Sequence, residues 1–221
     1  MNELTQLDLP LNNIIKKSED ESDDSPSIFF LHGFGSNMQD LFGLVQIFGK
    51  DWNCISLQAT IQVQYDGWAW ADLDFTNIGK LPKPEQMINH QKKVIGSIKK
   101  SIDLLNLNPN KINLLGFSQG ASLSIYCGLK DFELFNSVVA LCGFFPSDQI
   151  KGEMNNNAKK LDIFLANGTL DEMVPISLGH ATRDGLLSLG VQPDYKEYEC
   201  GHTISNDCMR DFLAWLKEKN M

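Results

Sequence analysis

Short apolar runs alternate with longer amphipathic segments over most of this chain. Runs suited to buried strands lie at 27–31, 53–57, 111–116, 136–142, 161–166 and 193–199. Apolar residues with helical spacing lie at 38–49, 84–106, 119–130, 176–189 and 203–219. Strands that alternate with helices require right-handed crossovers, so the pattern predicts an α/β fold with a mainly parallel central sheet flanked by helices. Ligands of such sheets bind at the carboxyl ends of the strands.

The 221 residues suit one domain with a full core, which we place at 27–221. Residues 1–26 form a polar N-terminal segment with one or two short edge strands. Between 60 and 83 the chain is irregular and rich in aromatic residues, and 146–160 is a polar loop with room for a short helix.

Charge and cysteine content exclude several classes of function. The formal net charge is −9, so a nucleic-acid phosphate backbone would be repelled and no nucleic-acid partner is expected. No apolar run approaches the roughly 20 residues that span a bilayer, and no signal-peptide pattern is visible, so no integral membrane association is expected. The five cysteines are odd in number and lack both paired and zinc-ligand spacing. We therefore expect reduced thiols, a cytoplasmic location and no metal.

One strand ends in a motif that exposes a serine. The apolar run 111–116 stops at Gly116, and Gly116-Phe117-Ser118-Gln119-Gly120 leads directly into a helical segment. A sharp strand-to-helix turn lifts a serine above the sheet and aims the first N–H groups of the helix at the same point. A side chain at either glycine would collide with the neighbouring strand or helix. Ser118 is therefore a candidate nucleophile; its alternative role is an ordinary helix N-cap.

A nucleophilic serine needs a base and an acid that orients the base. Of the four histidines, only His202 follows a strand downstream of the serine with a glycine beside it. In a sheet of this topology, the acid lies between the serine and the histidine along the chain. Asp171, which follows the strand at 161–166, is the candidate. Its neighbour Glu172 is the competing carboxylate. His32, in the turn after the first core strand, is expected to bond loop backbone rather than to act as a second base.

Two backbone N–H groups are candidates for the oxyanion hole, which needs preorganised donors. One belongs to Gln119, directly after the serine. The other belongs to Phe34, where Gly33 lets the loop after the first core strand bend inward.

Together these motifs resemble the phospholipase/carboxylesterase family of α/β-hydrolases, which includes the acyl-protein thioesterases. The segments that carry the resemblance are Leu31-His32-Gly33-Phe34-Gly35, Gly116-Phe117-Ser118-Gln119-Gly120-Ala121, Gly168-Thr169-Leu170-Asp171-Glu172-Met173-Val174-Pro175, Gly201-His202 and the Trp70-Ala71-Asp72 run. The resemblance covers the chain from about residue 27 to the C-terminus.

The resemblance implies an α/β-hydrolase fold and a serine carboxylesterase that hydrolyses acyl esters or thioesters through an acyl-enzyme. It assigns Ser118, Asp171 and His202 as the triad, in preference to Glu172, with Phe34 and Gln119 as oxyanion donors and no cofactor. The chain departs from the family at Asn167, where a histidine is usual, and in the segment before Trp70. We expect the first change to spare the triad and the second to alter the acyl pocket.

Aromatic and apolar residues near these strand ends are candidates for an acyl pocket. The candidate set is Trp70, Leu73, Phe75, Phe144 and Met173. Loop-borne aromatic residues can equally cap the core, and the sequence does not separate the two roles.

Substrate and partner choices stay open at this stage. Short to medium acyl chains are expected, with lysophospholipase or acyl-protein thioesterase activity on a lysophospholipid or an acylated protein as alternatives. A hydrolase-fold binding or sensing module with little turnover is an alternative of another class. The sequence does not determine oligomeric state, and a homodimer is one arrangement that it leaves open.

Overall fold

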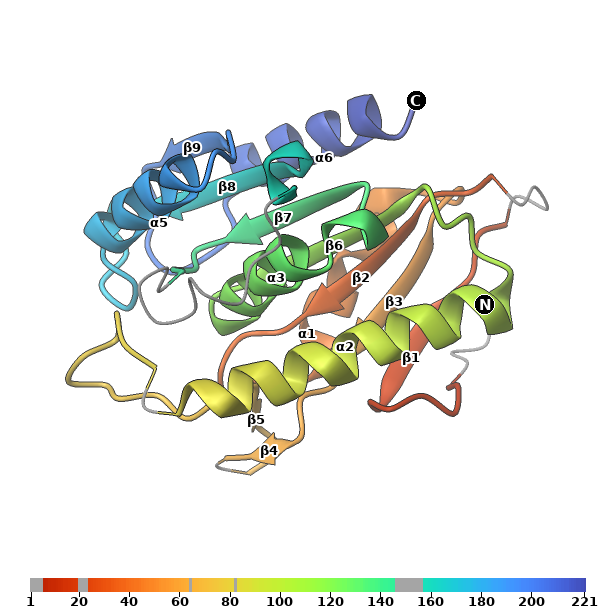
Figure 1. Cartoon of the computed structure of the whole chain (residues 1–221), viewed down its shortest axis with the longest axis horizontal. Coiled ribbons are helices and arrows are strands. Elements are labelled where there is room, and N and C mark those ends of the chain that lie inside the picture. Colours follow the sequence, from red (N-terminus) through yellow and green to blue (C-terminus); the bar gives the residue numbers. More distant parts are fainter. Residues whose placement is uncertain (1–5, 20–23, 64, 82, 146–156) are drawn as a thin grey trace.

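A computed structural model describes residues 6–19, 24–63, 65–81, 83–145 and 157–221. Its centre is a seven-stranded sheet in the order β1-β3-β2-β6-β7-β8-β9 (Figure 1). The strands are β1 (Asn13–Lys16), β2 (Ser27–Leu31), β3 (Asn53–Leu57), β6 (Ile112–Phe117), β7 (Ser137–Leu141), β8 (Asp162–Gly168) and β9 (Asp194–Tyr198). Only β1 runs antiparallel to its neighbour; the other pairs are parallel. The predicted α/β class with a mainly parallel sheet is confirmed.

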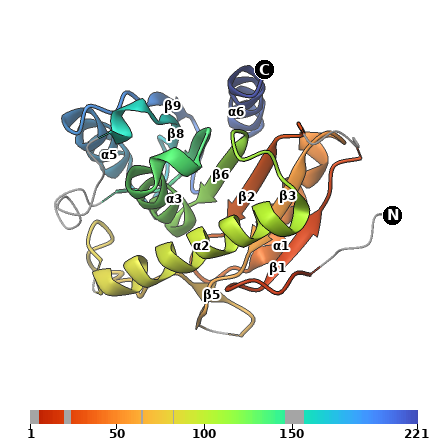
Figure 2. The same cartoon turned by 45° about the vertical axis from the view of Figure 1, so that its right-hand side comes forward.

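Helices cover both faces of the sheet (Figures 1 and 2). The longer ones are α2 (Pro84–Leu105), α3 (Gln119–Lys130), α5 (Ile176–Ser188) and α6 (Asn206–Lys219), and α1 is Met38–Phe42. Helices α2, α3 and α5 contribute to one hydrophobic cluster, whereas α1 and α6 contribute to the other. Both faces are thus closed, which explains why β2, β6 and β7 read as nearly continuous apolar runs rather than alternating ones.

Local sequence explains where these helices begin. Pro84 opens α2, where its missing N–H is not needed. Helix α6 begins at Asn206 rather than at the expected residue 203, because the Ser205 hydroxyl caps it by accepting a bond from the Cys208 N–H at 3.1 Å.

Two predicted segments differ in detail. The single helix expected at 38–49 is α1 followed by a 3₁₀ segment over Gly43–Phe48. The irregular stretch 60–83 contains a small second sheet of β4 (Ile61–Gln62) and β5 (Trp68–Ala69). Of the expected N-terminal edge strands, β1 is present; most of the loop at 146–160 lies outside the described residues.

Parallel order brings four chain segments to one edge of the sheet. Strands β2, β6, β7 and β8 are neighbours, and their carboxyl ends reach Leu31, Phe117, Leu141 and Gly168. The loops that follow carry the candidate oxyanion donor, the serine and the acid. The loop after β9, which pairs with β8, carries the histidine.

Candidate active site

Ser118 occupies a strained turn between β6 and α3. Its φ of 55° and ψ of −118° lie in a region that non-glycine residues rarely adopt. Such a conformation costs about 1–3 kcal/mol and persists only when the surroundings fix it. The Ser118 N–H donates to the Leu141 carbonyl at 2.8 Å, and the Ser118 carbonyl accepts from the Ala121 N–H at 3.0 Å. The backbone is thus held on both sides, as the predicted strand–turn–helix requires.

The two glycines of the motif are required by close backbone approach. A Cβ at Gly116 would lie 2.2 Å from the Gly120 carbonyl oxygen, and a Cβ at Gly120 would lie 2.0 Å from the Leu31 carbonyl oxygen. A nonbonded carbon and oxygen cannot approach each other that closely. The collision expected from the sequence is therefore present at both positions, and it explains how α3 can start directly against β2.

Ser118, His202 and Asp171 form one chain of hydrogen bonds. His202 Nδ1 lies 2.7 Å from Asp171 Oδ2, and His202 Nε2 lies 2.9 Å from Ser118 Oγ. Because a carboxylate can only accept, Nδ1 carries the proton, which leaves Nε2 to accept the serine O–H. The three residues come from different strand ends, and the structure brings them together in the predicted order.

Asp171 is fixed by its own backbone neighbours. Its Oδ1 accepts from the Met173 N–H at 2.9 Å and from the Val174 N–H at 2.8 Å, which leaves Oδ2 for the histidine. Asp171 is buried, whereas Glu172 is exposed and bonds no histidine among the described residues. The geometry therefore selects Asp171 over Glu172. The family-atypical Asn167 donates to the Gly143 carbonyl at 3.2 Å and leaves this contact intact.

The backbone N–H groups of Phe34 and Gln119 are free to bind a ligand. Within the described part of the chain, neither donates to an internal acceptor. Both residues line the same cavity as Ser118 and His202. Gln119 also starts α3, so its N–H lies at the positive end of a helix dipole. The arrangement can stabilise negative charge that develops next to Ser118 Oγ.

The Gln119 side chain has a second role that the sequence reasoning missed. Its Oε1 accepts from the Trp70 N–H at 2.7 Å, and its Nε2 donates to the Ala71 carbonyl at 2.7 Å. This buried side chain therefore ties the aromatic-rich loop to the first turn of α3. The only signal was a polar residue directly after the nucleophile, and it did not reveal the partner.

An apolar cavity of about 170 Å³ opens beside the serine. Four of the five predicted pocket residues line it, namely Leu73, Phe75, Phe144 and Met173. Sequence reasoning missed Ile78, Phe117 and Val174, which complete the wall. Phe117 also packs against the His202 ring with centroids 4.9 Å apart.

Trp70 is the exception, and its predicted pocket role is wrong. It is fully buried and outside the cavity lining. Its Nε1–H donates to the His32 carbonyl at 2.8 Å, and its ring packs against His32 and His90. The indole points into the core because that is where a buried N–H finds an acceptor.

All five cysteines are free thiols. Cys142 lies near the triad: its Sγ, the Asp171 carboxylate and a His202 nitrogen are within 4.8 Å of one another, a set that could in principle ligate a metal. Burial, together with the nearby Asp171 charge, raises the pKa of Cys142 to about 12. At neutral pH the thiol is therefore protonated, and it donates to the Thr203 carbonyl at 3.4 Å.

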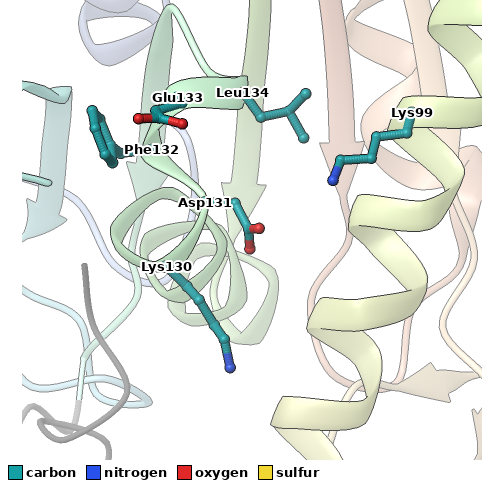
Figure 3. Close-up of a pocket in the computed structure, with 6 residues that line it drawn as sticks. All are labelled: Lys99, Lys130, Asp131, Phe132, Glu133 and Leu134. Carbon is teal, nitrogen blue, oxygen red and sulfur yellow. The ribbon is translucent and has the colours of Figure 1, made fainter. Parts of the chain in front are cut away.

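A second pocket, of about 360 Å³, lies at the opposite end of α3 (Figure 3). Its lining is Lys99, Lys130, Asp131, Phe132, Glu133 and Leu134. Lys99 extends from α2 toward the end of α3, and the other side chains come from that end and the turn after it. This lining holds neither a histidine nor a hydroxyl or thiol nucleophile, so we place the candidate chemistry at Ser118. Among the described residues, no helix has the length and apolarity needed to cross a membrane.

Comparisons with known proteins agree with this site. The family model described as Phospholipase/Carboxylesterase matches residues 12–220. Acyl-protein thioesterase 1 of Aspergillus fumigatus is 27% identical over 214 residues, which cover 87% of each chain. Acyl-protein thioesterase 1 of Yarrowia lipolytica is 26% identical over 155 residues, 68% of each chain.

Solved structures show the same fold. A carboxylesterase from Mesorhizobium loti superposes with a TM-score of 0.83 at 18% identity and covers 96% of this chain and 98% of its own. The Bacillus cereus carboxylesterase gives a TM-score of 0.81 at 17% identity, with 95% and 94% covered. The family match also takes in β1, beyond the start that the motifs alone suggested. The chain thus belongs to the phospholipase/carboxylesterase family of α/β-hydrolases.

Proposed function

We propose that this protein is a serine hydrolase that cleaves carboxylic esters and thioesters through an acyl-enzyme. One observation carries the proposal: Ser118 and His202, joined to Asp171 in one chain of hydrogen bonds, line an apolar cavity. Family membership and the names of the relatives, acyl-protein thioesterase and carboxylesterase, support the same chemistry.

Acylation follows from the geometry of the three side chains. Ser118 Oγ attacks the acyl carbonyl while His202 Nε2 takes the hydroxyl proton, and Asp171 Oδ2 stabilises the imidazolium through Nδ1–H. The Phe34 and Gln119 N–H groups bind the oxyanion, and each such donor is worth about 3 kcal/mol. When the tetrahedral intermediate collapses, the carbon–oxygen or carbon–sulfur bond to the leaving group breaks and His202 returns its proton to that group.

Deacylation repeats these steps with water. His202 Nε2 accepts a proton as the water oxygen attacks the acyl-serine carbonyl, and the proton passes back to Ser118 Oγ as the acid leaves. The water enters on the side that the leaving group has vacated. No cofactor takes part in this sequence.

The shape of the site favours a short to medium acyl chain. The cavity beside Ser118 measures about 170 Å³ and is lined mainly by apolar side chains, so it suits a small acyl group. The Phe34 and Phe75 rings, packed edge to face with centroids 5.6 Å apart, also line a second groove with Val63, Tyr65 and Gly67, which is more open to solvent. Longer chains would therefore gain less burial per added carbon.

The nucleophile is tested with a short-chain p-nitrophenyl ester. We expect Ser118→Ala to abolish turnover and labelling by a fluorophosphonate probe, whereas Ser188→Ala, on the exposed end of α5, keeps both. Activity that survives Ser118→Ala would contradict the proposal. A noncatalytic binding module of the same fold would show no acylation burst in the native protein.

Substrate choice is tested with p-nitrophenyl esters from acetate to palmitate and with an oxygen and a sulfur ester of one acyl group. We expect kcat/KM to peak at a short or medium chain and both esters to be cleaved. A maximum at palmitate would overturn the chain-length expectation. A lysophospholipid and an acylated-cysteine peptide, run alongside, decide between the two alternative substrate classes.

The five free thiols support an intracellular, reducing location, which we propose on that ground.

A further inference from the structure

His32 is a fully buried histidine that the mechanism above does not use. It follows β2 directly, in the loop that leads to Phe34. Its Nε2 accepts from the Ala59 N–H at 3.1 Å, which identifies Nδ1 as the protonated nitrogen. Nδ1–H in turn lies 2.8 Å from the Gly33 carbonyl oxygen, to which it donates. The ring therefore has one defined neutral tautomer.

The Gly33 carbonyl belongs to the same peptide unit as the Phe34 N–H. In a planar trans peptide the C=O and N–H bonds point in opposite directions. No cis peptide occurs among the described residues. A carbonyl held inward by the His32 ring therefore directs the Phe34 N–H outward, to the cavity that Phe34 shares with Ser118.

The preceding peptide is held as well. The His32 carbonyl accepts from Trp70 Nε1–H at 2.8 Å, and the His32 and Trp70 rings pack with centroids 5.0 Å apart. The Trp70 backbone N–H donates to Oε1 of Gln119. The backbone N–H of Gln119 is the other candidate oxyanion donor. The two donors are thus joined by one buried network rather than placed by separate loops.

We propose that His32 is the positioning residue of the oxyanion hole: its Nδ1–H fixes and polarises the Gly33–Phe34 peptide so that the Phe34 N–H meets the developing oxyanion. This inference rests on the proposed ester hydrolysis. A donor bonded to a peptide carbonyl strengthens the hydrogen bond made by the N–H of the same peptide, by about 10–30%. The larger effect is geometric, because a rotated peptide would remove a donor altogether.

Two substitutions of His32 test the hydrogen bonds of its two ring nitrogens one at a time. In His32→Asn the side-chain amide places an N–H donor where Nδ1 stands, and the acceptor for Ala59 is lost. In His32→Gln the amide reaches the Nε2 position and can accept from Ala59, but the donor to Gly33 is lost. His90→Gln is the matched control, since His90 is also buried and packs on Trp70 but bonds Thr60 and Gln86 instead.

We expect His32→Gln to lower kcat by about 10- to 100-fold with KM within about threefold, because one oxyanion donor is worth about 100- to 1,000-fold and here it is displaced rather than removed. His32→Asn should keep kcat within about threefold of the native protein, and His90→Gln should lower stability but not kcat. Urea titration confirms that each variant is folded in the assay. Equal kcat losses in the two His32 variants, or a loss confined to KM, would overturn the proposal.

A second measurement does not depend on activity. The ¹⁵N chemical shifts of the His32 ring at pH 7 should report a protonated Nδ1 and an unprotonated Nε2. The opposite tautomer would overturn the proposal even if all variants failed to fold. If the proposed ester hydrolysis is itself wrong, the native protein will be inactive or the Ser118→Ala variant will be active. Neither result depends on the His32 variants or on the tautomer measurement.

Discussion

At the scale of single residues, the acid of the triad offers the sharpest test. Asp171→Asn keeps an oxygen for the Met173 and Val174 N–H groups but presents an amide to His202 Nδ1, which favours the wrong imidazole tautomer. We expect kcat to fall by about 10⁴-fold while the urea midpoint changes little. The measurement is kcat on a short-chain aryl ester. Glu172→Gln, at the exposed neighbour, is the control and should stay within about twofold; a comparable loss there would reassign the acid.

His32 also predicts a dependence of stability on pH. Burial lowers the pKa of His32 to about 4, below the 6.5 of an unburied histidine. Between these values the unfolded chain binds the proton and the folded protein does not, so the free energy of unfolding falls as the pH falls from 6.5 to 4, by about 3 kcal/mol in full. Burial also lowers the pKa of His90, so His90 likewise lowers the free energy of unfolding as the pH falls.

Urea titrations at pH 7 and pH 4.5 measure this effect. His32→Asn cannot titrate, so we expect the stability gap between the native protein and this variant to narrow at the lower pH. Parallel stability curves for the two proteins would show that His32 is not the titrating group.

Residue-level prediction reached a small set of candidates where chemistry restricts the choice, and the structure places Ser118, His202 and Asp171 within hydrogen-bonding distance of one another. Few residue types can act as nucleophile, base and acid, and only four histidines competed for one role. The positions of Trp70 and of the Gln119 side chain could not be predicted in the same way. Both depend on which backbone groups lie nearby after folding. These partners are distant in the chain, so the neighbouring sequence does not predict them.

At the scale of elements, the junction of β2, β6 and α3 depends on backbone approach that only glycine permits. Gly120→Ala would place a Cβ 2.0 Å from the Leu31 carbonyl oxygen, so α3 must shift away from β2. We expect a loss of about 3 kcal/mol or more, measured as the free energy of unfolding in urea. Gly43→Ala is the matched control, because a Cβ there meets nothing within 4 Å. Similar small losses in both variants would contradict this account of the turn.

Element types were more predictable than their ends. Apolar periodicity identified the long helices and the central strands, because both faces of the sheet are covered and burial dictates the pattern. It did not separate α1 from the 3₁₀ segment that follows, since both keep Leu41, Val45 and Phe48 buried against the sheet. The difference lies in backbone hydrogen bonding, to which hydrophobic spacing is insensitive.

At the scale of the whole molecule, strand order determines which distant residues meet. The alternation of strands and helices predicted a parallel sheet. The order of elements along the chain did not show that β1 lies at the edge of this sheet, antiparallel to β3. That edge strand lies outside the 27–221 range set by the motifs, yet Leu11 and Ile15 are fully buried in the same cluster as α2 and α3. Leu11, Ile15 and β1 therefore belong to the packing of the domain, although the motifs placed its start at residue 27.

This packing predicts that a chain starting at residue 18 is much less stable. It loses Leu11 and Ile15, each worth about 1.5–3 kcal/mol of burial, and it uncovers the hydrogen-bonding edge of β3. Against a typical total stability of about 5–15 kcal/mol, we expect a lower urea midpoint together with concentration-dependent light scattering. Ile15→Ala in the full chain is the control, because it removes packing but keeps the edge covered. It should lose stability without scattering. If the shortened chain is no less stable than Ile15→Ala and stays monodisperse, β1 is dispensable and the sheet is closed by β3 alone.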